Sequence, residues 1–218
     1  MKVAATKTRE VALLDALGRS SGERIIHSYL KKHPNLLWGA FMNCGGHSDY
    51  VIPEFRIGSR FRCDFVVMQS YSGGWNIEFV ELEPVNVSLF NKDRTPSKPL
   101  RIALNQIDDW KRFLETDGAT MRSQLADAAK KNDLLQPDLN LGEEPSSFAG
   151  DDLRHPFTHI HAAYNIVIGR RDELDDVSNY VRNSYRSLHR VQVCTYDRFV
   201  QVARNADRND WLTRRGAA

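Results

Sequence analysis

Apolar residues near the start of the chain recur with the spacing of amphipathic helices. Residues 8–17 predict a short helix that Gly18 ends. Ser20 and Glu23 have the spacing of a capping box and predict the start of a second helix, with Pro34 just beyond its end. The apolar side of this second helix is formed by Ile25, Ile26, Tyr29 and Leu30. We expect both helices to bury one face.

The chain then changes to runs of β-forming residues separated by turn signals. The runs that predict strands cover residues 50–57, 61–69 and 75–83. Glycine-containing segments at 58–60 and 71–74 fit the two turns between them. Strands joined by such short connections pair in antiparallel fashion, so this region predicts a β-meander.

The second half of the chain alternates between helical and strand-like patterns. Helices are predicted over 100–115, 117–134, 172–188 and 196–205, and strands over 162–168 and 191–195. Proline, glycine and acidic residues in 136–156 predict a long loop. A meander followed by β-α units predicts an α/β fold with a mixed sheet flanked by helices. The expected divisions are a helical extension (1–19), a main domain (20–205) with a helical and loop insertion (117–156), and a polar tail (206–218).

The composition of the chain excludes few classes of protein function. The chain has 218 residues, which fits one domain, and its net charge of +2 neither favours nor excludes a nucleic-acid partner. The three cysteines, Cys44, Cys63 and Cys194, are far apart and are expected to be reduced thiols. No apolar signal core or membrane-spanning run is present, so we expect a soluble, cytoplasmic protein without membrane contact.

Acidic residues interrupt two of the predicted strands. Asp64 lies inside the apolar run 61–69, and Glu81 and Glu83 end the next run. Strand residues two apart point to one face, so Glu81 and Glu83 should project together, with Asp64 across from them if the strands pair. Clustered acids are costly to desolvate, and a hard divalent cation such as Mg²⁺ removes that cost.

Two readings of these acids stay open on spacing alone. They are either a metal-binding cluster or solvent-exposed acids at strand ends, paired with Arg60, Arg62 or Arg101. The helix that follows favours the first reading. Gln106 lies on the apolar side of that helix, four residues before Trp110, and such a glutamine needs a polar partner. A glutamine at the helix edge that bonds to a loop is the alternative.

Several segments, taken in order, resemble a known group of enzymes. The main ones are 62–65 (RCDF), 80–84 (VELEP) and 103–110 (ALNQIDDW), and the others are Glu23 with 33–37 (HPNLL), 166–170 (IVIGR) and 195–197 (TYD). This ordered set, spanning about 20–205, resembles the PD-(D/E)xK nuclease superfamily and, within it, the Shedu anti-phage defence nuclease domain.

The resemblance implies a restriction-endonuclease-like αβββαβ core and a DNA endonuclease, expected to nick DNA, that acts in anti-phage defence. It implies Mg²⁺ (or Mn²⁺) held by Asp64 and Glu81, with Glu83 as a further ligand. Gln106 completes the implied catalytic set, and Glu23 is an auxiliary residue. The implied partners are DNA and further copies of the same chain.

One position departs from the motif. Glu83 stands where the superfamily has a lysine that orients the attacking water and offsets charge in the transition state. A glutamate supplies no positive charge, but it can ligate metal or act as a base, and some restriction endonucleases of the superfamily carry glutamate there. Lys92 or Lys98 in the following loop could instead reach back. The alternative is a catalytically inactive DNA-binding or oligomerisation module.

Basic residues and histidines give further candidates. The expected phosphate contacts are Lys92, Arg94, Lys98, Arg101 and Arg170. Arg182, Arg186 and Arg190 form a basic stripe if their helix extends that far, although a solvated helix face is the more common reason for such spacing. His155, His159 and His161 lack an evident fourth zinc ligand, so we interpret them as surface or loop residues.

Overall fold

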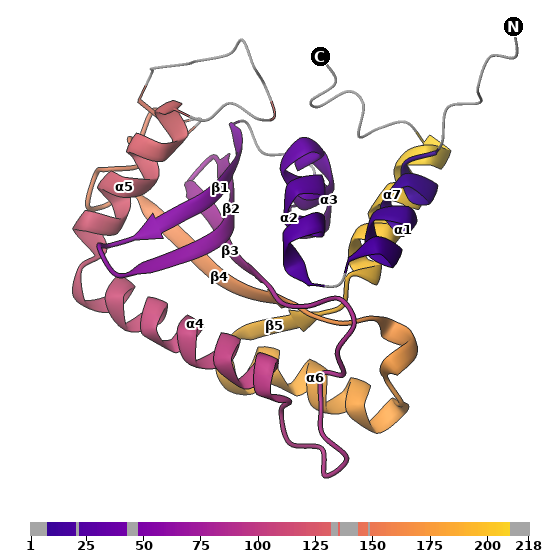
Figure 1. Cartoon of the computed structure of the whole chain (residues 1–218). Coiled ribbons are helices and arrows are strands. Elements are labelled where there is room, and N and C mark those ends of the chain that lie inside the picture. Colours follow the sequence, from indigo (N-terminus) through magenta and orange to yellow (C-terminus); the bar gives the residue numbers. More distant parts are fainter. Residues whose placement is uncertain are drawn as a thin grey trace, which may run out of the picture.

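The computed structural model describes residues 8–20, 22–42, 48–131, 135, 144–147 and 149–209. A five-stranded sheet with the order β1-β2-β3-β4-β5 forms its centre (Figure 1). The strands are β1 (Asp49–Ile57), β2 (Phe61–Tyr71), β3 (Gly74–Leu82), β4 (His159–Val167) and β5 (Val191–Cys194). β1, β2 and β3 pair antiparallel, whereas β3, β4 and β5 pair parallel. The predicted mixed sheet is therefore confirmed.

Helices cover both faces of this sheet. They are α1 (Arg9–Arg19), α2 (Glu23–Lys32), α3 (Pro34–Phe41), α4 (Lys98–Thr116), α5 (Gly118–Lys131), α6 (Asp176–His189) and α7 (Asp197–Asn209), with a 3₁₀ turn, η1 (Arg171–Glu173). Figure 1 shows α4 and α5 along one side of the sheet and α1, α2, α3 and α7 along the other. The order α2-β1-β2-β3-α4-β4 is the predicted αβββαβ core.

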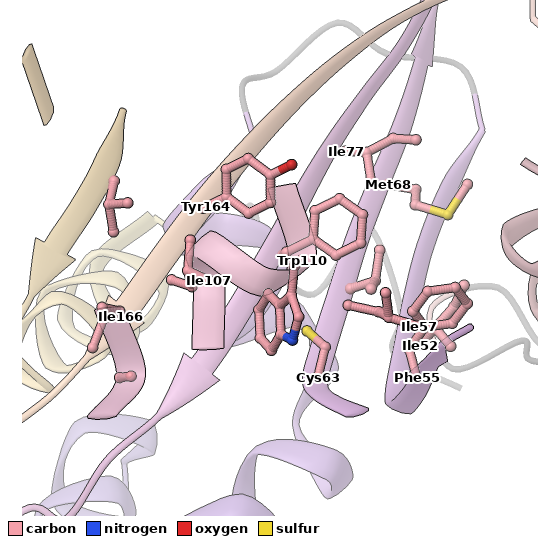
Figure 2. Close-up of a cluster of buried hydrophobic side chains, with 14 of the residues drawn as sticks. Ile52, Phe55, Ile57, Cys63, Met68, Ile77, Ile107, Trp110, Tyr164 and Ile166 are labelled. Carbon is pink, nitrogen blue, oxygen red and sulfur yellow. The ribbon is translucent and has the colours of Figure 1, made fainter. Parts of the chain in front are cut away.

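Two hydrophobic cores, one on each face of the sheet, hold these layers together. The first packs α1, α2, α3 and α7 against β-strand residues such as Val67 and Val80. The second packs α4 and α5 against the opposite face, and Figure 2 shows Ile107 and Trp110 of α4 beside Tyr164 of β4. The apolar stripe of α4 is buried as the helical spacing predicts, and this fixes the rotation of α4 about its own axis.

The start of the main domain differs from the prediction. Ser20 ends α1 by donating its hydroxyl to the Ala16 carbonyl, and α2 begins after Gly22 without a side-chain cap, so the capping box is wrong. Pro34 lies just beyond the end of α2 at Lys32, as predicted, but it also begins α3, a helix that the sequence analysis did not predict; the first turn of a helix tolerates proline. Ile25 is 43% exposed and does not belong to the buried side of α2.

The end of the chain also differs. α7 continues to Asn209, and Ala206 is fully buried, so the first four residues of the predicted polar tail are helical. α6 ends at His189, and Arg190 has a left-handed backbone, so the helical stripe of arginines stops before Arg190. Parts of the predicted helix 117–134 and loop 136–156, as well as Cys44 and residues 210–218, lie outside the described residues.

None of the described helices is both long enough and apolar enough to cross a bilayer.

The packing of Trp110 gives the first prediction. Its side chain is 1% exposed, and its ring lies 6.4 Å from that of Phe79 between their centroids. We expect Trp110→Ala to lower the free energy of unfolding by about 3–5 kcal/mol, since a cavity replaces the indole. Trp110→Phe should cost clearly less, because the indole nitrogen has no hydrogen-bond partner among the described residues. Urea denaturation of both variants measures this, and equal losses would contradict the packing role.

Candidate active site

Asp64 lies where β2 and β3 separate. Their ladder ends at the pair Phe65 and Val80, and Asp64 and Glu81 are the next residues on each strand. The Asp64 carboxylate takes the place of a backbone partner, because its Oδ2 accepts the Leu82 N–H at 2.8 Å. Asp64 therefore lies beside Glu81 at the end of the ladder, as the predicted strand pairing requires.

Glu81 and Glu83 project from the same face of the sheet. Leu82 between them is 2% exposed and packs into the core on the other face. The Glu83 N–H donates to the Val167 carbonyl at 2.8 Å, which extends the β3–β4 pairing just past the end of β3. The prediction that these two acids project together is confirmed.

Gln106 reaches this cluster from α4. Its Nε2 donates to Glu81 Oε1 at 2.9 Å and to the Arg62 carbonyl at 3.2 Å. The predicted need of this glutamine for a polar partner is thus met by the acid itself. The second carboxylate oxygen of Glu81, Oε2, is buried and has no hydrogen-bond partner in the part of the chain that the structure describes. A buried carboxylate oxygen without a donor is an open coordination position.

The acids line a groove with a volume of about 700 Å³. Its walls are formed by Glu23, Arg60, Phe61, Arg62, Asp64, Glu81, Leu82, Glu83, Ile102, Asn105, Gln106 and Asp109. Elements distant in sequence therefore meet here: the start of α2, the start of β2, the end of β3 and the middle of α4. A polar groove of this size admits a charged, extended ligand.

The electrostatics of the groove follow from burial and like charge. Burial, together with the charges of Asp64 and Glu83, raises the pKa of Glu81 to about 9. Burial and the charges of Glu23 and Asp64 raise the pKa of Glu83 to about 7, and burial also raises the pKa of Asp64. Without a positive charge, Glu81 is therefore held mostly protonated and Glu83 partly protonated near neutral pH.

The sequence analysis missed His27. Its Nε2 lies 3.9 Å from Asp64 Oδ1, and its ring packs on Phe65 with centroids 4.7 Å apart. Glu23 and His27 are four residues apart on α2, so their shared face was visible in the sequence once Glu23 had been singled out. Arg60 and Arg62 were considered only as partners of the acids, but both line the groove, and Arg62 pairs with Glu54 at 3.4 Å.

The five predicted phosphate contacts fall into two groups. Arg94 pairs with Asp175 at 2.6 Å and Arg170 pairs with Asp197 at 2.9 Å, so both already have anionic partners. Lys92, Lys98 and Arg101 are exposed and form no ion pair with any described residue. Lys98 and Arg101 precede the groove-lining Ile102 and Asn105 of α4 by four residues, so each shares a helix face with the groove. Their contact with DNA stays a prediction.

The histidines do not converge on one point. The Tyr71 hydroxyl and His159 Nδ1 share a hydrogen bond of 2.6 Å, and the His155 ring packs against Phe157. His161 lines a different cavity beside Glu78. Across the described residues, no three or more His, Cys, Asp or Glu side chains are arranged as a preformed metal site.

Comparison with known proteins identifies the group to which this fold and groove belong. The family model described as Shedu protein SduA, C-terminal, matches residues 20–200, a span that contains every groove residue named above. The chain belongs to the Shedu SduA C-terminal family. This is a defence-system nuclease family. A search of curated proteins found no match.

The match covers the arrangement from α2 through β5 to the first turn of α7. α1 lies before the matched span, yet Leu13 and Leu17 of α1 are buried in the same core as α7. The described part of the predicted N-terminal extension is therefore packed on the family domain through α7.

The raised pKa of Glu81 gives a prediction on pH and stability. Folding moves the pKa of Glu81 from its ordinary value of 4.5 to about 9, so the folded chain keeps a proton that the unfolded chain loses. The stabilisation is present below pH 4.5 and is lost as the pH rises through about 9. In the presence of chelator, we expect the free energy of unfolding to fall between these limits, and Glu81→Gln to flatten this fall.

Urea denaturation at a series of pH values measures the effect. Glu115→Gln, at an exposed position of α4, is the matched control and should keep the wild-type slope. A wild-type protein that gains stability over this pH range, or a Glu81→Gln variant with an unchanged slope, would contradict the electrostatics of the groove.

Proposed function

We propose that this Shedu-family domain is a divalent-metal-dependent endodeoxyribonuclease that hydrolyses phosphodiester bonds, with nicking of duplex DNA as the expected outcome. The observation that carries the proposal is the meeting of Asp64, Glu81 and Glu83 in one groove, with a buried Glu81 oxygen that has no donor among the described residues. The family membership supports nuclease chemistry and a role in defence against phage.

The donor set of the groove fits a hard divalent cation. Mg²⁺ and Mn²⁺ prefer oxygen ligands, and Mg²⁺ is commonly held by only one or two carboxylates together with water and phosphate. Asp64 and Glu81 would hold the ion, with Glu83 as a third carboxylate ligand. Such a cation lowers the pKa of a bound water and offsets negative charge on a phosphodiester. It would also remove the repulsion that raises the pKa values of all three acids.

The protein's own residues contribute positioning and proton transfer. The Leu82 N–H fixes one oxygen of Asp64, and Gln106 fixes one oxygen of Glu81, so the free oxygens of both acids are held in place. Where Glu83 does not ligate the cation, it is able to accept a proton from the attacking water. This role suits a glutamate at the position where the superfamily has lysine.

Positive charge for the substrate comes from the rim of the groove. Arg60 and Arg62 belong to its wall, and the guanidinium group of each would contact phosphate oxygens of a bound backbone. Lys98 and Arg101 continue the groove-lining faces of α4 toward its N-terminus. A DNA backbone that follows this path would bring one phosphodiester to the acids.

Loss of the acids gives the catalytic prediction. Asp64→Asn and Glu81→Gln should each reduce the nicking of supercoiled plasmid in Mg²⁺ or Mn²⁺ by more than about 100-fold, as removal of essential transition-state stabilisation does. Gln106→Ala should cost about 10–100-fold, because it loosens a ligand without removing it. Gel separation of supercoiled from relaxed plasmid measures both, with Glu115→Gln as the active control.

The Glu83 position separates this proposal from an inactive DNA-binding module. If the wild-type chain retains plasmid DNA on a gel-shift assay but cuts it in neither Mg²⁺ nor Mn²⁺, the module is favoured and the nuclease proposal fails. Cleavage that survives in Glu81→Gln would instead show that the acids named here are not the active site.

Metal binding can be tested without DNA. Saturating Mn²⁺ should stabilise the wild-type chain by about 2.7 kcal/mol at a hundred times its dissociation constant, which raises the melting temperature. Asp64→Asn and Glu81→Gln should lose this increase, whereas Glu115→Gln should keep it. Differential scanning fluorimetry with and without chelator is the measurement. An equal increase in all four proteins would mean that Mn²⁺ binds elsewhere.

A further inference from the structure

A second cavity lies away from the acidic groove, beside strand β5. It has a volume of about 540 Å³ and is bordered by α3, α6, β5 and α7. Four arginines line it: Arg171 of η1, Arg182 and Arg186 of α6, and Arg198 of α7. Among the residues that the structure describes, no aspartate or glutamate lines it, and none lines both this cavity and the acidic groove. The cavity therefore concentrates positive charge in a concave site.

Within the described chain, the arginines of this cavity are not neutralised by ion pairs. Arg182 donates to the Asn179 side-chain oxygen at 2.6 Å and to the Val193 carbonyl at 3.3 Å. Arg198 donates to the Ala40 carbonyl at 2.7 Å. These acceptors are neutral groups. The side chains of Arg171 and Arg186 are exposed and form no hydrogen bond or ion pair with a described residue.

The nearest acids are engaged elsewhere. Asp197, next to Arg198 in sequence, accepts the guanidinium of Arg170 and the backbone N–H of Arg171. Glu78 lines the adjoining cavity with Arg186 and Arg198, and its Oε2 accepts Asn165 at 2.7 Å; burial raises the pKa of Glu78, which disfavours its charge. Burial and the charges of Arg171 and Arg198 lower the pKa of Arg182. Arg171 and Arg198 therefore repel Arg182 across a partly desolvated space, and an anion would relieve that repulsion.

The shape of the cavity and its remaining walls restrict the anion. Guanidinium groups bind phosphate oxygens in a two-pronged manner, and four of them around one bounded cavity match several negative charges at one place. A DNA backbone instead spreads its charges at regular intervals along an extended surface. Asn183, Gln192 and Gln201 add amide groups, and Val193 and Val202 add an apolar wall. A volume of this size is typical of small-molecule sites.

We propose that this arginine cavity binds a small anion with two or more phosphate groups, such as a nucleoside di- or triphosphate. The amide groups and the valine wall suit the sugar and base of a nucleotide, whereas the arginines suit its phosphates. The proposal does not depend on nuclease activity, since the cavity and the acidic groove have no lining residue in common.

Isothermal titration calorimetry on the full chain, in chelator and at about 0.15 M salt, tests the proposal. The probes are tripolyphosphate, a nucleoside triphosphate and the same nucleoside without phosphate. The variant Arg171→Gln/Arg186→Gln changes the two arginines whose side chains form no hydrogen bond or ion pair with a described residue, so the fold should be kept, and its melting temperature checks this. Arg208→Gln, at an exposed position of α7 outside the cavity, is the matched control.

We expect the wild-type chain and Arg208→Gln to bind the phosphate probes and the double variant to bind them about 100-fold more weakly, about tenfold per arginine. Tighter binding of the nucleoside triphosphate than of tripolyphosphate identifies a nucleotide site, and equal binding identifies a site for polyphosphate alone. Absence of phosphate binding by the wild-type chain would overturn the proposal, as would equal binding by the folded double variant. A double variant that loses only affinity for duplex DNA would overturn it as well, because the cavity would then be part of a DNA surface.

Discussion

The mutual repulsion of three carboxylates at the point where β2 and β3 separate is the constraint around which this structure is arranged. The β2–β3 ladder ends at Phe65, the residue next to Asp64, and the Asp64 carboxylate then accepts the Leu82 N–H in place of a backbone partner. Glu81 is held by Gln106 from α4. Two of the three acids are therefore fixed by direct hydrogen bonds, although their charges oppose their closeness. Such an arrangement is costly in an empty protein and becomes favourable once a cation is bound.

The two hydrophobic cores supply the energy that keeps these acids together. Ile107 and Trp110 anchor α4 on one face of the sheet, and this places Gln106 beside the end of β3. On the other face, Leu82 packs into the first core, with α1, α2, α3 and α7, and so turns Glu81 and Glu83 away from it. α2 packs in this first core as well and brings Glu23 to the wall of the groove. The site thus depends on contacts that lie far from its own polar atoms.

The sequence predicted the features that depend on local periodicity. Three runs of β-forming residues separated by turn signals predicted the meander. The two-residue spacing of Glu81 and Glu83 predicted their common face, because successive side chains of a strand point to opposite faces. The start of the domain was harder to predict from the sequence. A proline is compatible both with the end of one helix and with the first turn of the next, so Pro34 did not reveal α3. The Ser20–Glu23 spacing suggested a cap that the chain does not form. Features assembled from distant segments were not predictable. His27 comes close to Asp64 only because α2 packs against the sheet. The four cavity arginines come from η1, α6 and α7, and only two of them, Arg182 and Arg186, shared a recognisable spacing in the sequence.

A crystal structure of the wild-type chain grown with Mn²⁺, with anomalous diffraction recorded at the manganese edge, tests the central claim most directly. The account predicts an anomalous peak between Asp64 and Glu81, in contact with a carboxylate oxygen of each, and a Glu81 Oε2 that now has a partner. Well-ordered acids in the same positions, with no peak between them at saturating Mn²⁺, would contradict the claim that these carboxylates form a binding site for a divalent cation.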